Sequence, residues 1–198
     1  MELTPDPVFV VDLNPDSTTV ISRLAFPLGS SSSRAFGKEY MATKLTWDDL
    51  LIQPVDSELA ASCLKEWDFI LDGRFAPVSM SKFGDWFLRR EDGSTDELSV
   101  IEGTLTKIAD SPDAFVNLLN RQDWQEEHLL SLQIYDLYER GLVPSEGHCY
   151  GFAPHPSLTN RIDIEQAMLL TIPVWQTICA QTFAPKPTNA EQSGRRRF

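Results

Sequence analysis

Three short runs of strand-like sequence near the middle of the chain constrain its fold more than any other feature. The runs are DWFLRR at 85–90, TDELSVI at 95–101 and TLTKIA at 104–109. The joints at 91–93 and 102–103 both end in glycine, which readily adopts the positive backbone angles of a hairpin turn. Together the three runs predict an antiparallel β-meander.

Helical patterns flank the meander on both sides. Their apolar residues recur at helical spacing, and several follow a residue that can cap a helix, such as Ser111 with Pro112 in the first turn. Predicted helices begin at Thr46 and span 56–67, 111–119, 123–140 and 173–183, and a further strand is predicted at 161–172. We therefore expect an α+β fold, in which the antiparallel meander packs with several helices.

The two ends of the chain differ from the region 46–183, which we expect to form one domain. Residues 1–45 predict a strand-rich extension with an N-terminal β-hairpin, because two alternating runs flank the turn sequence Asn14-Pro15-Asp16. Residues 184–198 have no apolar period and predict a disordered tail that contains the basic run Arg195 to Arg197.

The net charge narrows the classes of partner. The chain carries 17 Lys and Arg residues against 29 Asp and Glu residues, a formal charge of −12. Such a field repels nucleic acid and anionic lipid, so we expect neither as a direct partner. The same field speeds encounter with a basic protein, although solubility alone also explains an acidic surface.

The segment EGHCYGFAPHP at 146–156 concentrates residues that could carry chemistry, since it holds two of the three histidines and one of the three cysteines. Adjacent side chains of an extended segment point to opposite faces, so His148 cannot easily activate the thiol of Cys149. The glycines and prolines instead fit an extended chain that carries Tyr150 and Phe152 into a core. We expect a structural segment and keep a cysteine-dependent enzyme using Cys149 as the alternative.

The sequence predicts no metal, cofactor or catalytic residue. Cys63, Cys149 and Cys179 form no CxxC pair, and the histidines show no zinc-ligand spacing. No GxxxxGK[ST] loop, GxGxxG fingerprint or GxSxG elbow is present. We therefore do not expect an enzyme.

A cytoplasmic location is expected. No apolar run is long enough to cross a bilayer, and the N-terminal residues MELTPDPVFVVDL lack the basic start of a signal peptide. The few, widely spaced cysteines are typical of reduced thiols.

Several of these stretches together resemble a known family over about residues 46–183. MSKFGDWFLRREDG, KIADSPDAFVNLL and PSEGHCYGFAPHPSLTNR, with the short meander and the terminal strand and helix, are similar to immunity proteins of the Tdi family. The residues most specific to this resemblance are Phe83, Gly84, Asp85, Cys149, Tyr150, Gly151 and Phe152.

The resemblance implies an immunity protein, or antitoxin, that binds and neutralises a cognate effector of a bacterial type VI secretion system. It implies a DNase as the effector and assigns no catalytic residue. Because a nuclease has a basic groove for phosphate, an acidic inhibitor is steered toward it. A regulatory or scaffold domain of the same fold is a further alternative.

Candidate toxin-binding residues are the acids of the two predicted turns, of the neighbouring strand and of the acidic face of the helix at 123–140, with two tryptophans as anchors. They are Asp92, Asp96, Glu97, Glu102, Glu126, Glu127, Trp86 and Trp124.

Overall fold

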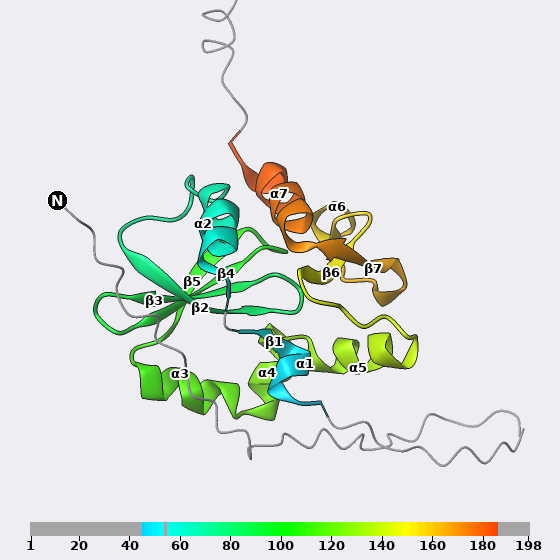
Figure 1. The fold of residues 1–198 in the computed structure, drawn as a ribbon, viewed down its shortest axis with the longest axis horizontal. Helices are drawn as coiled ribbons and strands as arrows, with labels where there is room; N and C mark the ends of the chain where they lie inside the picture. Colours follow the sequence, from blue (N-terminus) through cyan, green and yellow to red (C-terminus); the bar gives the residue numbers. More distant parts are fainter. Residues whose placement is uncertain (1–44, 54, 186–198) are drawn as a thin grey trace, which may run out of the picture.

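A five-stranded antiparallel sheet lies at the centre of the structure, a computed structural model that describes residues 45–53 and 55–185 (Figure 1). The strands follow one another in sequence order across the sheet. They are β1 (Leu51–Ile52), β2 (Phe75–Ser81), β3 (Trp86–Arg90), β4 (Thr95–Ser99) and β5 (Thr104–Ala109). The meander predicted from the sequence is confirmed as β3, β4 and β5, and the α+β class is confirmed with it.

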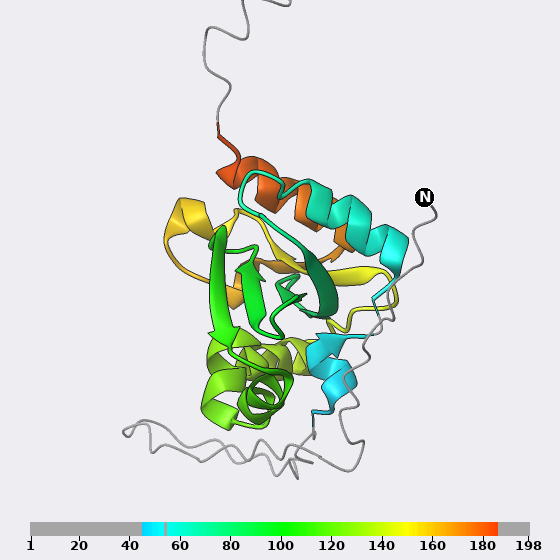
Figure 2. The same ribbon diagram turned by 90° about the vertical axis from the view of Figure 1, so that its left-hand side faces the viewer.

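Helices and a second, two-stranded sheet surround this meander. The helices are α1 (Trp47–Leu50), α2 (Ser57–Lys65), α3 (Pro112–Leu119), α4 (Gln122–His128), α5 (Ser131–Glu139), α6 (Pro156–Thr159) and α7 (Ile172–Phe183). The second sheet pairs β6 (His148–Phe152) with β7 (Ala167–Thr171) in antiparallel register. Both views place α2 and α7 on one side of the main sheet and α3 and α4 on the other (Figure 1, Figure 2).

The central strands β3 and β4 of the main sheet are therefore largely buried on both faces, and the middle of β3 shows this directly. Trp86 faces α7, where its indole Nε1 donates a hydrogen bond to Gln176 Oε1 at 3.0 Å. The next residue, Phe87, faces the other helices, with ring centroids 5.3 Å from Phe115 and 5.8 Å from Trp124. Consequently, alternate residues of a central strand enter two different cores.

Some element boundaries differ from the prediction. The helix expected at 123–140 is two helices, because Leu130 adopts a left-handed backbone conformation with φ of 50° between α4 and α5. The strand expected at 161–172 covers only Ala167–Thr171 and follows a short 3-10 turn, η1 (Ile164–Gln166). The predicted N-terminal hairpin and nearly all of the predicted tail lie outside the described residues.

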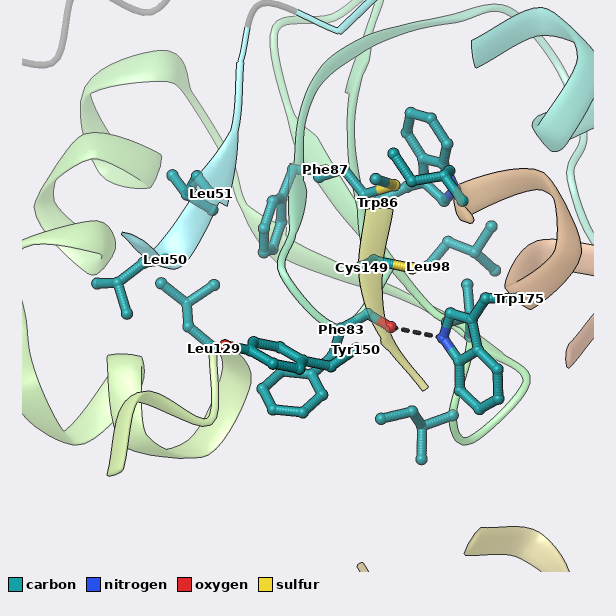
Figure 3. Packing of buried hydrophobic residues seen from close by; sticks show 14 of the residues in the cluster. Leu50, Leu51, Phe83, Trp86, Phe87, Leu98, Leu129, Cys149, Tyr150 and Trp175 are labelled. Carbon is teal, nitrogen blue, oxygen red and sulfur yellow. Dashed lines mark hydrogen bonds between the residues drawn. The ribbon is translucent and has the colours of Figure 1, made fainter. Parts of the chain in front are cut away.

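The turn between β2 and β3 holds α7 in place. Trp175 Nε1 donates to the carbonyl oxygen of Phe83 at 2.7 Å, the contact drawn in Figure 3, and Gln176 Nε2 donates to the carbonyl oxygen of Gly84 at 2.7 Å. Gly84 has a φ of +99°, and a Cβ there would lie 2.9 Å from Trp175. Only glycine combines this backbone angle with such a close approach.

The segment 146–156, which holds Cys149 and two histidines, also packs against α7. Phe152 stacks on Phe83 with ring centroids 5.7 Å apart, and Tyr150 lies 5.1 Å from the same ring. A Cβ on Gly151 would lie 2.8 Å from the indole of Trp175, so a larger residue would push the helix away. The residues that carry the family resemblance thus lie at the junction of β2, β3, β6 and α7.

The helices are too short or too polar for a membrane span. Among the described residues, none is both long and apolar enough to cross a bilayer.

Candidate protein-binding surface

The predicted acidic turns do not lie together. Asp92 is in the turn between β3 and β4, and Glu102 is in the turn between β4 and β5. In an antiparallel meander consecutive turns lie at opposite ends of the shared strand, here five residues and thus about 17 Å long. Phe183 on α7 lies beside the Glu102 turn, whereas Pro112 on α3 lies beside the Asp92 turn. The two acids therefore lie at opposite ends of β4 and do not form one compact cluster.

Asp96 and Glu97 are buried, which corrects their assignment as surface contacts. They are 9% and 8% exposed, respectively. Asp96 Oδ2 accepts from Arg90 Nε at 2.6 Å on one face of the sheet, and Glu97 Oε2 lies 2.6 Å from His128 Nδ1 on the other. A carboxylate paired within a covered sheet is not available to a partner protein.

The two tryptophans proposed as anchors are also buried. Trp86 is 0% exposed and Trp124 is 6% exposed. Trp124 packs between Phe87 and the ring of His128, which stacks on it with centroids 4.6 Å apart. Both assignments are wrong for the same reason: a helix layer covers each face of the sheet.

The remaining predicted acids are not buried. Asp92, Glu102 and Glu127 are exposed, and Glu126 is half-buried and accepts from Gln122 Nε2 at 2.9 Å. Asp92 also shapes its own turn, because its Oδ1 accepts from the backbone N–H of Ser94 at 2.9 Å. These four residues stay candidates for contact with a partner.

A buried cluster of ionisable side chains connects the turn after β2 to α4. Asp85 accepts from Ser81 Oγ and from the backbone N–H of Val100, each at 2.9 Å. Burial raises the pKa of Asp85 to about 7, and the nearby charge of Glu97 acts in the same direction. The hydrogen bond to Glu97 raises the pKa of His128. No regular spacing in the sequence links residues 85, 97 and 128.

Cys149 is placed as a packing residue. Its side chain is 0% exposed, and desolvation raises the pKa of its thiol to about 12, so the thiol is protonated at neutral pH. His148 Nδ1 lies 3.1 Å from Ser145 Oγ, and the His155 Nδ1 lies 2.9 Å from Ser157 Oγ. Neither imidazole is placed to activate the sulfur, which speaks against the cysteine-dependent alternative.

The described residues likewise hold no group of three or more His, Cys, Asp or Glu side chains arranged to bind a metal ion.

A groove that the sequence did not indicate lies between α5 and the segment that leads into η1. Its volume is about 500 Å³. It is lined by Leu132, Gln133, Asp136, Arg161, Ile162, Asp163 and Ile164. A smaller hollow of about 210 Å³ shares Arg161 and Asp163 with it and continues toward Phe152 and Pro156. In Figure 1 the helix α5 and the connection from α6 to β7 lie on the same side of the molecule.

Large apolar side chains are exposed around this groove. Leu132 and Ile162 in its walls are 43% and 40% exposed. Leu158 is 75% exposed on α6, between two residues that line the smaller hollow. Exposed apolar side chains that gather beside polar ones are typical of protein-binding surfaces. We therefore take the groove and its rim as the candidate functional site.

Comparisons with known proteins leave the chain without an assigned family. No family model and no curated protein matches it. Among solved structures, that of Atu4351 from Agrobacterium tumefaciens is similar with a TM-score of 0.41 and 15% sequence identity, over 63% of this chain and 63% of that one. A similarity of this size carries no argument about function.

Proposed function

We propose that the chain is an immunity protein that binds a cognate type VI secretion effector, a nuclease, and neutralises it by occlusion. Two features of the sequence support the proposal: the resemblance to the Tdi family around Phe83 to Asp85 and around Cys149 to Phe152, and the acidic charge. The acidic charge is the observation on which the proposed function mainly rests. Between residues 45 and 185 the chain holds 23 Asp and Glu residues against nine Lys and Arg residues.

The physical basis is electrostatic complementarity. A nuclease binds a polyanion and so presents a basic groove, and an acidic protein is attracted to the same groove. Attraction of this kind raises the association rate, while buried apolar contacts give the complex its lifetime. Exposed Asp92, Glu102 and Glu127 contribute to the field, and the rim of the groove supplies apolar contacts.

Inhibition by occlusion needs no chemistry on the immunity protein. Binding the folded toxin tightly is sufficient. When the inhibitor is in excess, the fraction of toxin that stays free is approximately the dissociation constant divided by the inhibitor concentration. A buried, protonated Cys149 agrees with such a role. Since the effector acts on DNA inside the recipient cell, a cytoplasmic location is part of the proposal.

Co-expression tests the proposal. Effector candidates encoded beside this chain are expressed in a sensitive bacterium with the chain, with an empty vector, or with an unrelated acidic protein of similar charge. We expect growth to be restored, and chromosomal DNA to stay intact, only with this chain. Equal killing in all three strains for every candidate would reject the proposal.

A further inference from the structure

We propose that the groove between α5 and the residues 161–164 is the anchor point for the partner, and that it takes an apolar side chain flanked by lysine or arginine. The inference rests on the proposed function, because the partner is the basic effector named there. It adds the surface used and the chemistry of the segment that fits it.

The shape of the groove suits a protruding side chain. Its floor and walls combine the apolar Leu132, Ile162 and Ile164 with the polar Gln133 and Asp136. A volume of about 500 Å³ exceeds that of any single side chain, so a short protruding segment of the partner fits into it. Apolar side chains seated in such a pocket and shielded from water contribute most of the energy in typical interfaces.

Polar contacts join the end of α5 to the segment 164–165 and brace the 161–164 wall of the groove. Arg140, directly after α5, donates from Nη1 to the carbonyl oxygen of Ile164 at 2.6 Å. The same guanidinium lies 3.7 Å from a carboxylate oxygen of Glu165. On the far wall, Arg161 Nη2 pairs with Asp163 Oδ2 at 2.9 Å. A wall fixed in this way loses little conformational entropy when a partner binds.

The charges of α5 indicate a basic partner. Asp136 and Glu139 lie in the last turn of the helix, which has no basic residue. Carboxylates at a helix C-terminus are unfavourable because they lie at the negative end of the helix dipole. Neither makes an ion pair with another described residue, whereas Arg161 and Arg140 are already paired with Asp163 and Glu165. The charge left uncompensated around the groove is therefore negative.

The last turn of α5 thus carries two carboxylates that no described ion pair offsets, and the positive charge of the C-cap residue Arg140 is directed to Glu165. Local choices that lower stability without compensation are expected at functional sites. A lysine or arginine of a bound partner would offset the two carboxylates, and the apolar rim would enclose the neighbouring side chain. The groove thus fits an apolar residue next to a basic one better than it fits an acidic or purely apolar segment.

The first arm of the test changes the apolar rim. Leu132→Asp, Leu158→Asp and Ile162→Asp are compared with Val143→Asp and Val174→Asp, which are 51% and 48% exposed outside the groove. The probe is the catalytically inactivated effector that the wild-type chain protects against, and affinity is measured by calorimetry. We expect each rim variant to weaken binding at least about tenfold and the two controls to change it less than about threefold. Thermal melting checks that all five variants are folded.

The second arm changes the charge. Asp136→Lys is compared with Asp68→Lys, a reversal at an exposed acid shortly after α2, and Figure 1 shows α2 and α5 on opposite sides of the main sheet. A lysine at position 136 interacts favourably with the negative end of the α5 dipole, so we expect Asp136→Lys to cause no loss of stability. We expect slower association with the effector for Asp136→Lys than for Asp68→Lys, at equal net charge.

The two proposals fail in different ways. If the wild-type chain binds and protects but the rim variants and Asp136→Lys behave like their controls, the groove is not the anchor and the proposed function stands. If the wild-type chain neither binds nor protects, the proposed function fails and this inference fails with it. Loss of binding confined to the groove variants supports both.

Discussion

Asp85 places a carboxyl group where water has little access. It is 5% exposed, and its oxygens accept hydrogen bonds from Ser81 and Val100. These bonds favour the ionised form, but desolvation outweighs them and raises the pKa to about 7. The side chain ties the turn after β2 to the end of β4, and this tie is the structural reason for an acid in the Phe83-Gly84-Asp85 sequence.

Stability is expected to fall as pH rises from about 5 to 8. Because the pKa of Asp85 is raised on folding, the folded chain holds a proton that the unfolded chain has lost, and each rise in pH through this window favours unfolding. The raised pKa of His128 acts in the same direction, since its stabilisation is lost as the pH passes its folded pKa. The Asp85 contribution is roughly 2–4 kcal/mol.

Urea unfolding at pH 5 and pH 8 checks this expectation. Asp85→Asn keeps an acceptor for Val100 and removes the titrating proton. The variant should therefore lose most of the pH dependence and keep the smaller part due to His128. An unchanged slope in Asp85→Asn would show that the carboxyl does not titrate in this window.

At the scale of elements, one buried amide, the side chain of Gln176, links α7 to three other segments. Gln176 Oε1 accepts from the indoles of Trp67 at 3.2 Å and Trp86 at 3.0 Å, while its Nε2 donates to the carbonyl oxygen of Gly84. The residue joins α7 to the segment after α2, to β3 and to the turn between β2 and β3. Its side chain is 0% exposed, so every one of these polar groups depends on it.

Gln176→Leu is expected to destabilise the fold by roughly 3 kcal/mol. Leucine has a similar volume but leaves two indole N–H groups and one carbonyl oxygen without their partner in a buried site. Thr177→Val, a half-buried position on the same helix, is the matched control and should change stability by less than about 1 kcal/mol. Chemical denaturation compares the two, and equal effects would contradict the role given to Gln176.

Periodicity predicted most elements but not their environment. The strands between residues 86 and 109 and the helix Pro112–Leu119 were predicted from the local apolar pattern and from capping residues, and the structure has them at these positions. The break at Leu130 was missed because the apolar period continues through it. Asp96 and Glu97 were expected to contact a partner because they are acidic residues beside a predicted turn, whereas elements distant in sequence cover both faces of β4.

At the scale of the whole molecule, the groove could not be predicted from sequence for a related reason. Its walls come from residues 132–136 and 161–164, which no local spacing connects. The exposed Leu158 and Ile162 appeared in the sequence only as part of a loop and a predicted strand. The net charge, by contrast, can be counted without knowing the fold. The expectation of a basic partner therefore followed from the amino-acid composition alone.

The central claim is that the chain acts as an acidic surface for a basic protein, and the salt dependence of association tests it most directly. Stopped-flow measurements would follow the wild-type chain binding the inactivated effector from about 50 mM to about 500 mM salt. We predict that the association rate constant falls at least about tenfold while the dissociation rate constant changes little. An association rate constant that does not change with salt, or no complex at low salt, would contradict the claim.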